Sequence, residues 1–149
     1  MPLQQKFIMS LHLPIGQAVS SAQLIIDDIK WEKVAFYDDL KDKILNIEVL
    51  DPKFISENQL GGGELGLNRV EALIKNNSAY NFWDVKLKVL LYRENTLVYI
   101  NEIPVRTLNS GSSYDMAFNV FNGLTRPNKV YVFPEVDILN PESFKGFDG

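Results

Sequence analysis

Apolar and polar side chains alternate with a period of two along much of the second half of the chain. The strongest case spans residues 85–91, where valine or leucine occupies every odd position and lysines stand at 86 and 88. Residues 69–75 and 114–120 alternate in the same way. Because successive side chains of a β-strand point to opposite faces of a sheet, this period predicts strands with one buried face and one solvated face.

Turn-forming sequences separate these segments and set their spacing. Residues that favour turns occur in four segments: Asn76-Asn77-Ser78, Arg93-Glu94-Asn95, residues 108–112 and residues 126–128. A β-branched and aromatic return strand is expected from Thr96, and Pro104 fits an edge strand or a bulge. Short strands separated by turns roughly every ten residues are typical of all-β sandwiches. The fold predicted is therefore an antiparallel β-sandwich.

The first third of the chain leaves two alternatives open. Residues 24–29, 31–37 and 44–50 are apolar enough for strands, whereas 21–45 also approximates one apolar helical face. The cluster of Trp, Val, Phe and Tyr within 31–37 favours a strand.

We accordingly divide the chain into an N-terminal extension, residues 1–45, and a sandwich, residues 46–149. The extension holds an extra strand or helix and is a possible docking segment. Asp51-Pro52 is expected to end the strand that begins at Ile44, and residues 56–66 are expected to form a loop.

Composition excludes several chemistries. The 149 residues include no cysteine and a single histidine, His12, so disulfides, thiolate sites and paired-histidine sites are impossible. Nineteen acidic against 15 basic side chains give a net charge of −4, which argues against nucleic acid as a partner. No apolar run approaches the ~20 residues of a membrane-spanning helix.

Three motifs are weak evidence for ligands. Gly61, Gly63 and Gly66 match G-x-G-x-x-G, but a strand-like segment follows where a nucleotide fold needs a helix. Asp27-Asp28 and the acidic residues within 38–42 match no calcium loop and indicate a solvated surface. We predict no catalytic residue, no metal site and no cofactor.

Two sets of residues remain as candidates for binding. Tyr80, Phe82 and Trp83 form either an aromatic ligand platform or a plug at one end of the sandwich. Apolar side chains near the two ends of the chain are candidates for docking on a protein partner: Phe7, Leu11, Leu13, Phe144 and Phe147. Asn76-Asn77-Ser78 also has the form of a glycosylation sequon.

Three segments resemble FxLYD-type immunoglobulin-like domains, a pattern shared by late-embryogenesis-abundant-type domains. Residues 69–78 are similar to the opening strand and its Asn-Asn-Ser end, and residues 85–93 to the signature strand, with Leu91-Tyr92-Arg93 at the Leu-Tyr-Asp place. Residues 108–112, followed by Phe118, are similar to the closing segment. Arg93 and Ser110 depart from the family's aspartate and proline. The resemblance covers residues 46–139.

The resemblance implies a non-catalytic, immunoglobulin-like sandwich, commonly exported from a bacterial or archaeal cell and anchored to its membrane. Lys6 and the apolar residues 7–13 loosely resemble a secretory signal, although they also suit a first strand or a docking segment. Our expectation is thus an extracytoplasmic structural or interaction module that binds a protein partner or assembles with itself. A carbohydrate- or small-ligand-binding sandwich is the alternative.

Overall fold

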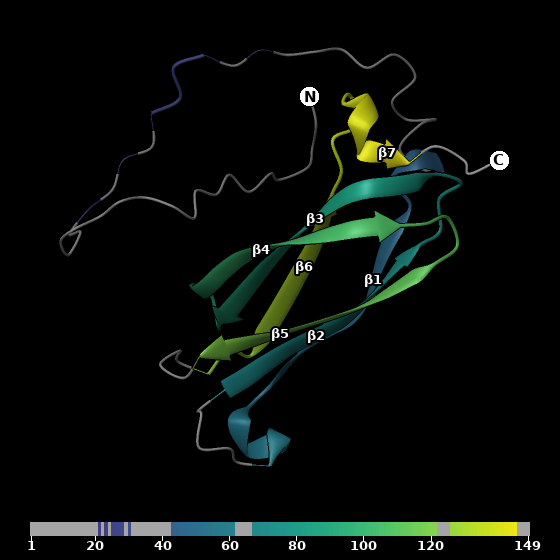
Figure 1. The fold of residues 1–149 in the computed structure, drawn as a ribbon. Coiled ribbons are helices and arrows are strands. Elements are labelled where there is room, and N and C mark those ends of the chain that lie inside the picture. The colour runs from purple at the N-terminus through teal and green to yellow at the C-terminus, as the bar shows by residue number, and fades with distance from the viewer. Residues whose placement is uncertain are drawn as a thin grey trace. The chain divides into compact units, whose positions relative to one another are not determined.

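The computed structural model describes the chain in several stretches: residues 21, 23, 25–28, 30, 43–61, 67–121 and 126–145 (Figure 1). The chain divides into two units, residues 1–35 and 36–149. In the first unit, residues 25–28 adopt neither the strand nor the helix expected there, and Ile25 and Ile26 are exposed. The rest of the predicted extension lies largely outside the described residues.

The second unit holds two antiparallel sheets, as Figure 1 shows. Its elements are β1 (Ile47–Ile55), η1 (Glu57–Leu60), β2 (Leu67–Asn76), β3 (Asn81–Arg93), β4 (Thr96–Leu108), β5 (Ser113–Phe121), β6 (Lys129–Glu135), η2 (Pro141–Ser143) and β7 (Phe144–Lys145). The first sheet has the order β1-β2-β5, and the second has the order β4-β3-β6 with β7 paired to β3. The predicted all-β antiparallel sandwich is confirmed.

Alternate residues of the predicted strands form the core between the sheets. In β2, Val70, Ala72 and Ile74 are buried, and in β3 the odd positions from Val85 to Leu91 are buried as well. Met116 and Val120 of β5, in the same sheet as β2, also contribute to this core. Tyr99 of β4 and Phe118 of β5 stack across the sheets with ring centroids 6.3 Å apart. The core is thus formed by the period-two positions of strands that are distant in sequence.

The paired ends of β3 and β4 depart from strict alternation. Phe82 and Val85 are both buried although they lie three residues apart, and so are Leu108 and Val105 on β4. Between the last two lies Thr107, whose φ of 66° is unusual for a β-branched residue. This irregularity reverses which face each strand presents to the core, and it decides which aromatic side chains at this end are exposed.

One predicted boundary is wrong. Asp51-Pro52 does not end the first strand of the sandwich, because β1 continues to Ile55. The pairing with β2 shifts between Leu50 and Lys53, which marks a bulge, and Asp51 takes a φ of 47° within it. The strand tolerates Pro52 because β1 is at the edge of its sheet, where a missing N–H costs no ladder hydrogen bond.

Two other predictions about turns and edges are confirmed. Glu94-Asn95 forms the hairpin turn between the paired residues Arg93 and Thr96. Pro104 lies on β4, which is an edge strand of the second sheet. The return strand from Thr96 continues through Pro104 to Leu108, because an edge proline removes no hydrogen bond that the sheet requires.

Candidate functional site

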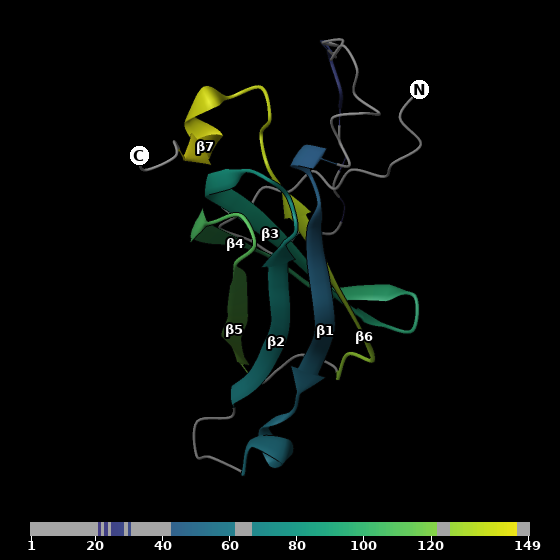
Figure 2. The same ribbon diagram turned by 90° about the vertical axis from the view of Figure 1, so that its right-hand side faces the viewer.

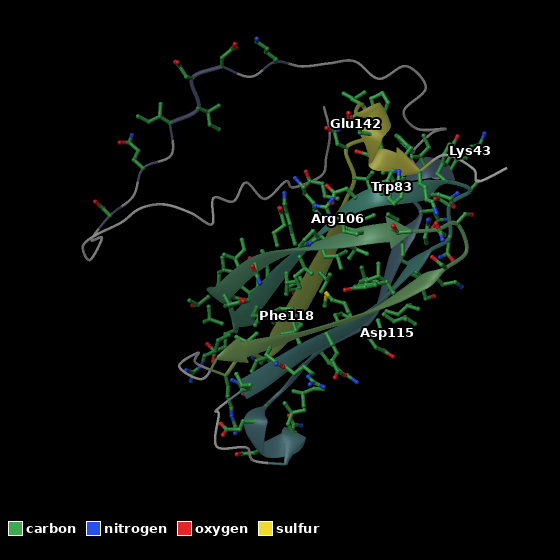
Figure 3. The ribbon with its side chains drawn as sticks, in the orientation of Figure 1. Lys43, Trp83, Arg106, Asp115, Phe118 and Glu142 are labelled. Atoms are coloured by element: carbon green, nitrogen blue, oxygen red, sulfur yellow. The ribbon has the colours of Figure 1, made fainter. Side chains whose placement is uncertain are left out.

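The three aromatic residues predicted as a ligand platform do not share a surface. Phe82 is 0% exposed and belongs to the core, whereas Trp83 is 47% exposed. Adjacent residues of a strand point to opposite faces, so these two rings cannot form one platform. Tyr80 lies just before the strand and is partly exposed. Figure 3 labels Trp83 at this end of the sandwich, with Arg106 of the neighbouring strand close by.

A lysine side chain lies over the exposed ring of Trp83. The Nζ atom of Lys145 lies 5.4 Å from the centre of the Trp83 ring, within the range of a cation–π contact. Lys145 reaches this position because β7 pairs with the start of β3, which aligns Asn81 with Lys145. Trp83 is therefore the most exposed of the three predicted platform residues, and Lys145, which is not among them, lies over its ring.

Phe144, predicted to dock on a partner, packs on its own domain. Its ring centroid lies 5.7 Å from that of Phe82 and 5.9 Å from that of Tyr80. The same residue pairs with Phe82 through β7, so the aromatic cluster plugs this end of the sandwich. Phe144 thus has a packing role in its own domain, and its docking on a partner stays a prediction. Phe7, Leu11, Leu13 and Phe147 lie outside the described residues.

Asn76 organises the turn that precedes β3. Its side-chain amide donates to the carbonyl oxygens of Tyr80, at 2.8 Å, and Leu108, at 3.1 Å. Its oxygen accepts from the Ser78 N–H at 3.0 Å and from the Ser78 hydroxyl at 2.6 Å. Because Asn76 is 0% exposed, the sequon that it begins cannot be glycosylated in the folded domain. The Asn-Asn-Ser motif therefore has a structural role here.

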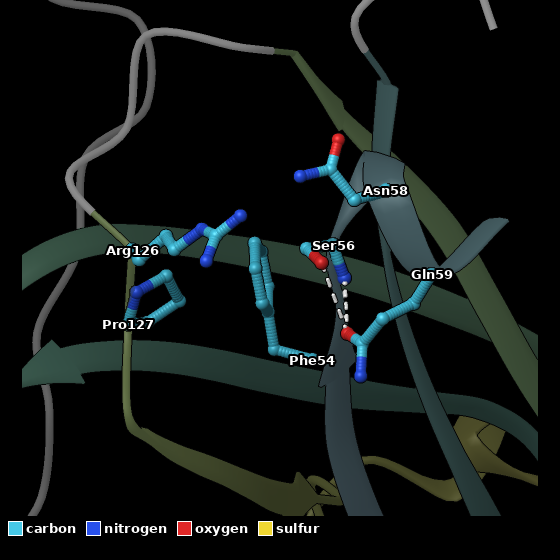
Figure 4. Close-up of a pocket in the computed structure, with 6 residues that line it drawn as sticks. All are labelled: Phe54, Ser56, Asn58, Gln59, Arg126 and Pro127. Carbon is cyan, nitrogen blue, oxygen red and sulfur yellow. Dashed lines mark hydrogen bonds between the residues drawn. The ribbon is translucent and has the colours of Figure 1, made fainter. Parts of the chain in front are cut away.

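A shallow pocket lies at another part of the sandwich, beside η1. It measures about 390 Å³ and is lined by Phe54, Ser56, Asn58, Gln59, Arg126 and Pro127. Figure 4 shows the Phe54 ring between Arg126 and Ser56. The Ser56 N–H and hydroxyl both donate to Gln59 Oε1, at 2.9 and 3.0 Å. These polar groups therefore stabilise the N-terminal end of η1. The lining residues that the structure describes are apolar, amide, hydroxyl or guanidinium groups.

Sequence reasoning missed a row of aromatic side chains on the outer face of the second sheet. Tyr131 and Phe133 of β6 stack with centroids 6.2 Å apart, and Tyr92 of β3 meets Tyr131 edge-on at 5.7 Å. Beside them Lys88, expected to be solvated, is buried and pairs with Glu135. The signal for this row was the spacing of two residues between Tyr131 and Phe133, alternating with buried Val132.

Among the described residues, Tyr99 has a pKa shifted from its ordinary value. Burial raises the pKa of the Tyr99 phenol, while a hydrogen bond with Asn101 lowers it, and the net direction is upward. Tyr99 is therefore neutral around neutral pH. Within the described stretches, no group of three or more histidine, aspartate or glutamate side chains is placed to hold a metal ion. His12 and the acidic run 38–42 lie outside those stretches, as do Gly63 and Gly66.

The second unit thus belongs structurally to the antiparallel β-sandwiches. Comparison with protein-family models, with characterised protein sequences and with solved structures finds no match to the chain. Among the described residues, no helix has the length and apolar character needed to cross a membrane.

Proposed function

We propose that the chain is a non-catalytic, immunoglobulin-like module that works outside the cytoplasm by assembling with protein, including copies of itself. The observation that carries the proposal is the architecture of the second unit. It is a sandwich with edge strands and with large apolar side chains exposed on its strands, and both features suit contact with protein. Its assignment to the outside of the cytoplasm rests on the resemblance of residues 46–139 to exported domains.

The order of the strands supports the immunoglobulin-like assignment. Immunoglobulin domains place strands A, B and E in one sheet and C and F in the other, and variable-type domains add C′ beside C. The order β1-β2-β5 follows A-B-E, and β4-β3-β6 follows C′-C-F. The chain also crosses between sheets after β2, β4 and β5, as the Greek-key connection of these domains requires.

The distribution of side chains supports an interaction role. Buried polar side chains bind groups of the domain itself: Asn76 donates a hydrogen bond to the Leu108 carbonyl oxygen, and Lys88 forms an ion pair with Glu135. Large apolar side chains are exposed on strand surfaces, including Tyr114, Tyr131 and Phe133. Aromatic residues are enriched at the centres of protein interfaces because they bury a large area with few rotatable bonds. The predicted docking segment 7–13 is a further candidate for such contacts.

Self-assembly is the direct test of this function. We expect size-exclusion chromatography with light scattering to report a mass above that of the monomer for the full chain. The mass should rise as the protein is concentrated from the low micromolar to the near-millimolar range, since association follows mass action. A chain that stays monomeric throughout this range contradicts the proposal.

Trp83 favours a second candidate function, binding of a carbohydrate or another small ligand. The exposed ring beside Lys145 offers one face on which a ligand can stack. If this function is correct, Trp83→Ala weakens a glycan-array signal about tenfold, the amount expected when one aromatic contact is lost. Tyr131→Ala, which removes another exposed ring, serves as the control and leaves the signal unchanged. The absence of any glycan signal from the unaltered chain rules this candidate out.

A further inference from the structure

We propose that two copies of the chain associate through β5, which pairs antiparallel with β5 of the second copy. The two first sheets then form one continuous sheet in the order β1-β2-β5-β5-β2-β1. This inference rests on the proposed function, assembly with protein, and names the surface and the partner. Figure 2 shows β5 at the margin of its sheet, on the side opposite β1.

Edge strands attract other strands because their outward N–H and C=O groups lack a neighbour, and natural sheets carry features that block such pairing. Three described edges have such features. β1 contains a bulge with Pro52, β4 contains Pro104 and the strained Thr107, and β6 contains Pro134. In addition, β7 is only two residues long.

β5 has none of these features. It pairs with β2 over nine consecutive residues without a shift of register. It contains no proline and no residue with positive φ, and Asp115 is its sole charged residue. Among the described residues its pairing partner is β2 alone. A regular, proline-free edge of this length is the form of strand that accepts another strand.

The second copy is the partner because the sequence of β5 is complementary to itself when it is reversed. The strand runs from Ser113 to Phe121, so a two-fold axis at Ala117 pairs all nine residues with their counterparts. Odd-numbered residues then face odd-numbered residues, and even-numbered face even-numbered. The core-facing side chains of both copies therefore lie on the same face of the joined sheet. Ala117 meets Ala117 of the second copy, and Met116 meets Phe118.

Charge is consistent with the same register. Asp115 faces Asn119 of the second copy, and the two Asp115 side chains are offset by four residues, about 13 Å along the strand. That separation exceeds the ~8 Å screening length at physiological salt, so the two carboxylates repel little. Arg69 Nε lies 3.5 Å from Asn119 Oδ1, in the cross-strand row that the second copy's Asp115 would continue. Arg69 of one copy and Asp115 of the other therefore lie in the same cross-strand row, with Asn119 between them.

Cysteine substitution tests this register sharply, because the chain contains no cysteine of its own. Opposed Cα atoms in an antiparallel pair are about 4.5–5.5 Å apart, within the range that a disulfide spans. Under mild oxidation we expect Ala117→Cys to form a disulfide-linked dimer nearly completely. Ala79→Cys is the matched control, since Ala79 is also an exposed alanine but lies in the turn before β3. We expect it to cross-link at least tenfold more slowly.

A mixed pair of variants tests the register independently. Asp115→Cys and Asn119→Cys should each cross-link poorly alone but form a linked heterodimer when mixed, because each faces the other across the axis. The unaltered chain is measured by light scattering beside them. If it associates while Ala117→Cys behaves like Ala79→Cys, the β5 interface is wrong and the proposed assembly function stands. If deletion of residues 1–20 abolishes association, the β5 pair is also overturned, since it needs none of that segment. A strictly monomeric chain overturns both proposals.

Discussion

Replacing Phe82 with alanine is expected to lower the free energy of unfolding by about 3–5 kcal/mol, the usual cost of deleting a fully buried phenylalanine ring. Phe82 is 0% exposed, and its ring packs against Phe144 within the plug at this end of the sandwich. The substitution leaves a cavity and also removes the surface on which β7 docks. Urea denaturation followed by circular dichroism measures the change.

The adjacent residue provides the control. Trp83→Ala removes a larger ring, but one that is half exposed and contacts Lys145 from the solvent side. We expect it to cost about 1 kcal/mol or less, because a partly exposed cation–π contact contributes ~0.5–1 kcal/mol. Equal losses for the two variants would mean that the strand irregularity at Thr107 does not separate a buried from an exposed side chain.

The second large effect is expected at Asn76. Asn76→Ala removes four hydrogen bonds from a fully buried position and leaves the Leu108 and Tyr80 carbonyl oxygens without this donor. Since a buried polar group left unsatisfied costs ~1–3 kcal/mol, we expect a total loss of about 3 kcal/mol. Asn76→Asp should cost at least as much at neutral pH, because it points a buried carboxylate at the same two carbonyl oxygens.

The next residue in the chain is the matched control for this prediction. Asn77 is exposed, and its side chain donates one hydrogen bond to Glu48 Oε2, at 3.1 Å. Asn77→Ala should lower the free energy of unfolding by about 0.5 kcal/mol, the low end for a solvated hydrogen bond. Thermal unfolding of the three variants side by side compares them. A mild effect at Asn76 would show that water replaces the lost amide and that the turn is less enclosed than its burial indicates.

Much of the sandwich could be predicted because its strands bury one face each. The alternation of residues 69–75, 85–91 and 114–120 predicts strands within β2, β3 and β5, and all three are present. Most of the expected side chains face inward, but Tyr114, near the start of β5, is exposed. Turn chemistry at Glu94-Asn95 predicts the hairpin for the same reason, since it depends on local backbone preferences. The sequence pattern predicts these elements correctly because each depends on side chains and backbone preferences within its own segment.

The candidate site was less predictable because it depends on contacts between distant segments. Phe82 and Trp83 are neighbours in sequence, yet the irregularity opposite them at Thr107 sends one inward and the other outward. The contact of Phe144 with its own domain is not predictable from its segment, because nothing there indicates that β7 returns to β3. Asp51-Pro52 predicts a strand end, but the position of β1 at an edge, which makes the proline tolerable, is a property of the whole sheet.

The class of fold and the limits of its chemistry thus follow from the amino-acid sequence alone. The period of two requires half-buried strands, and the absence of cysteine with a single histidine excludes disulfide and thiolate chemistry outright. Among the described residues, the assembled fold is needed to show which strands lie at the sheet edges, which aromatic rings are exposed and which asparagine is buried. The reason is physical: edges and burial arise when strands far apart in sequence pair and pack, and no local pattern encodes that order.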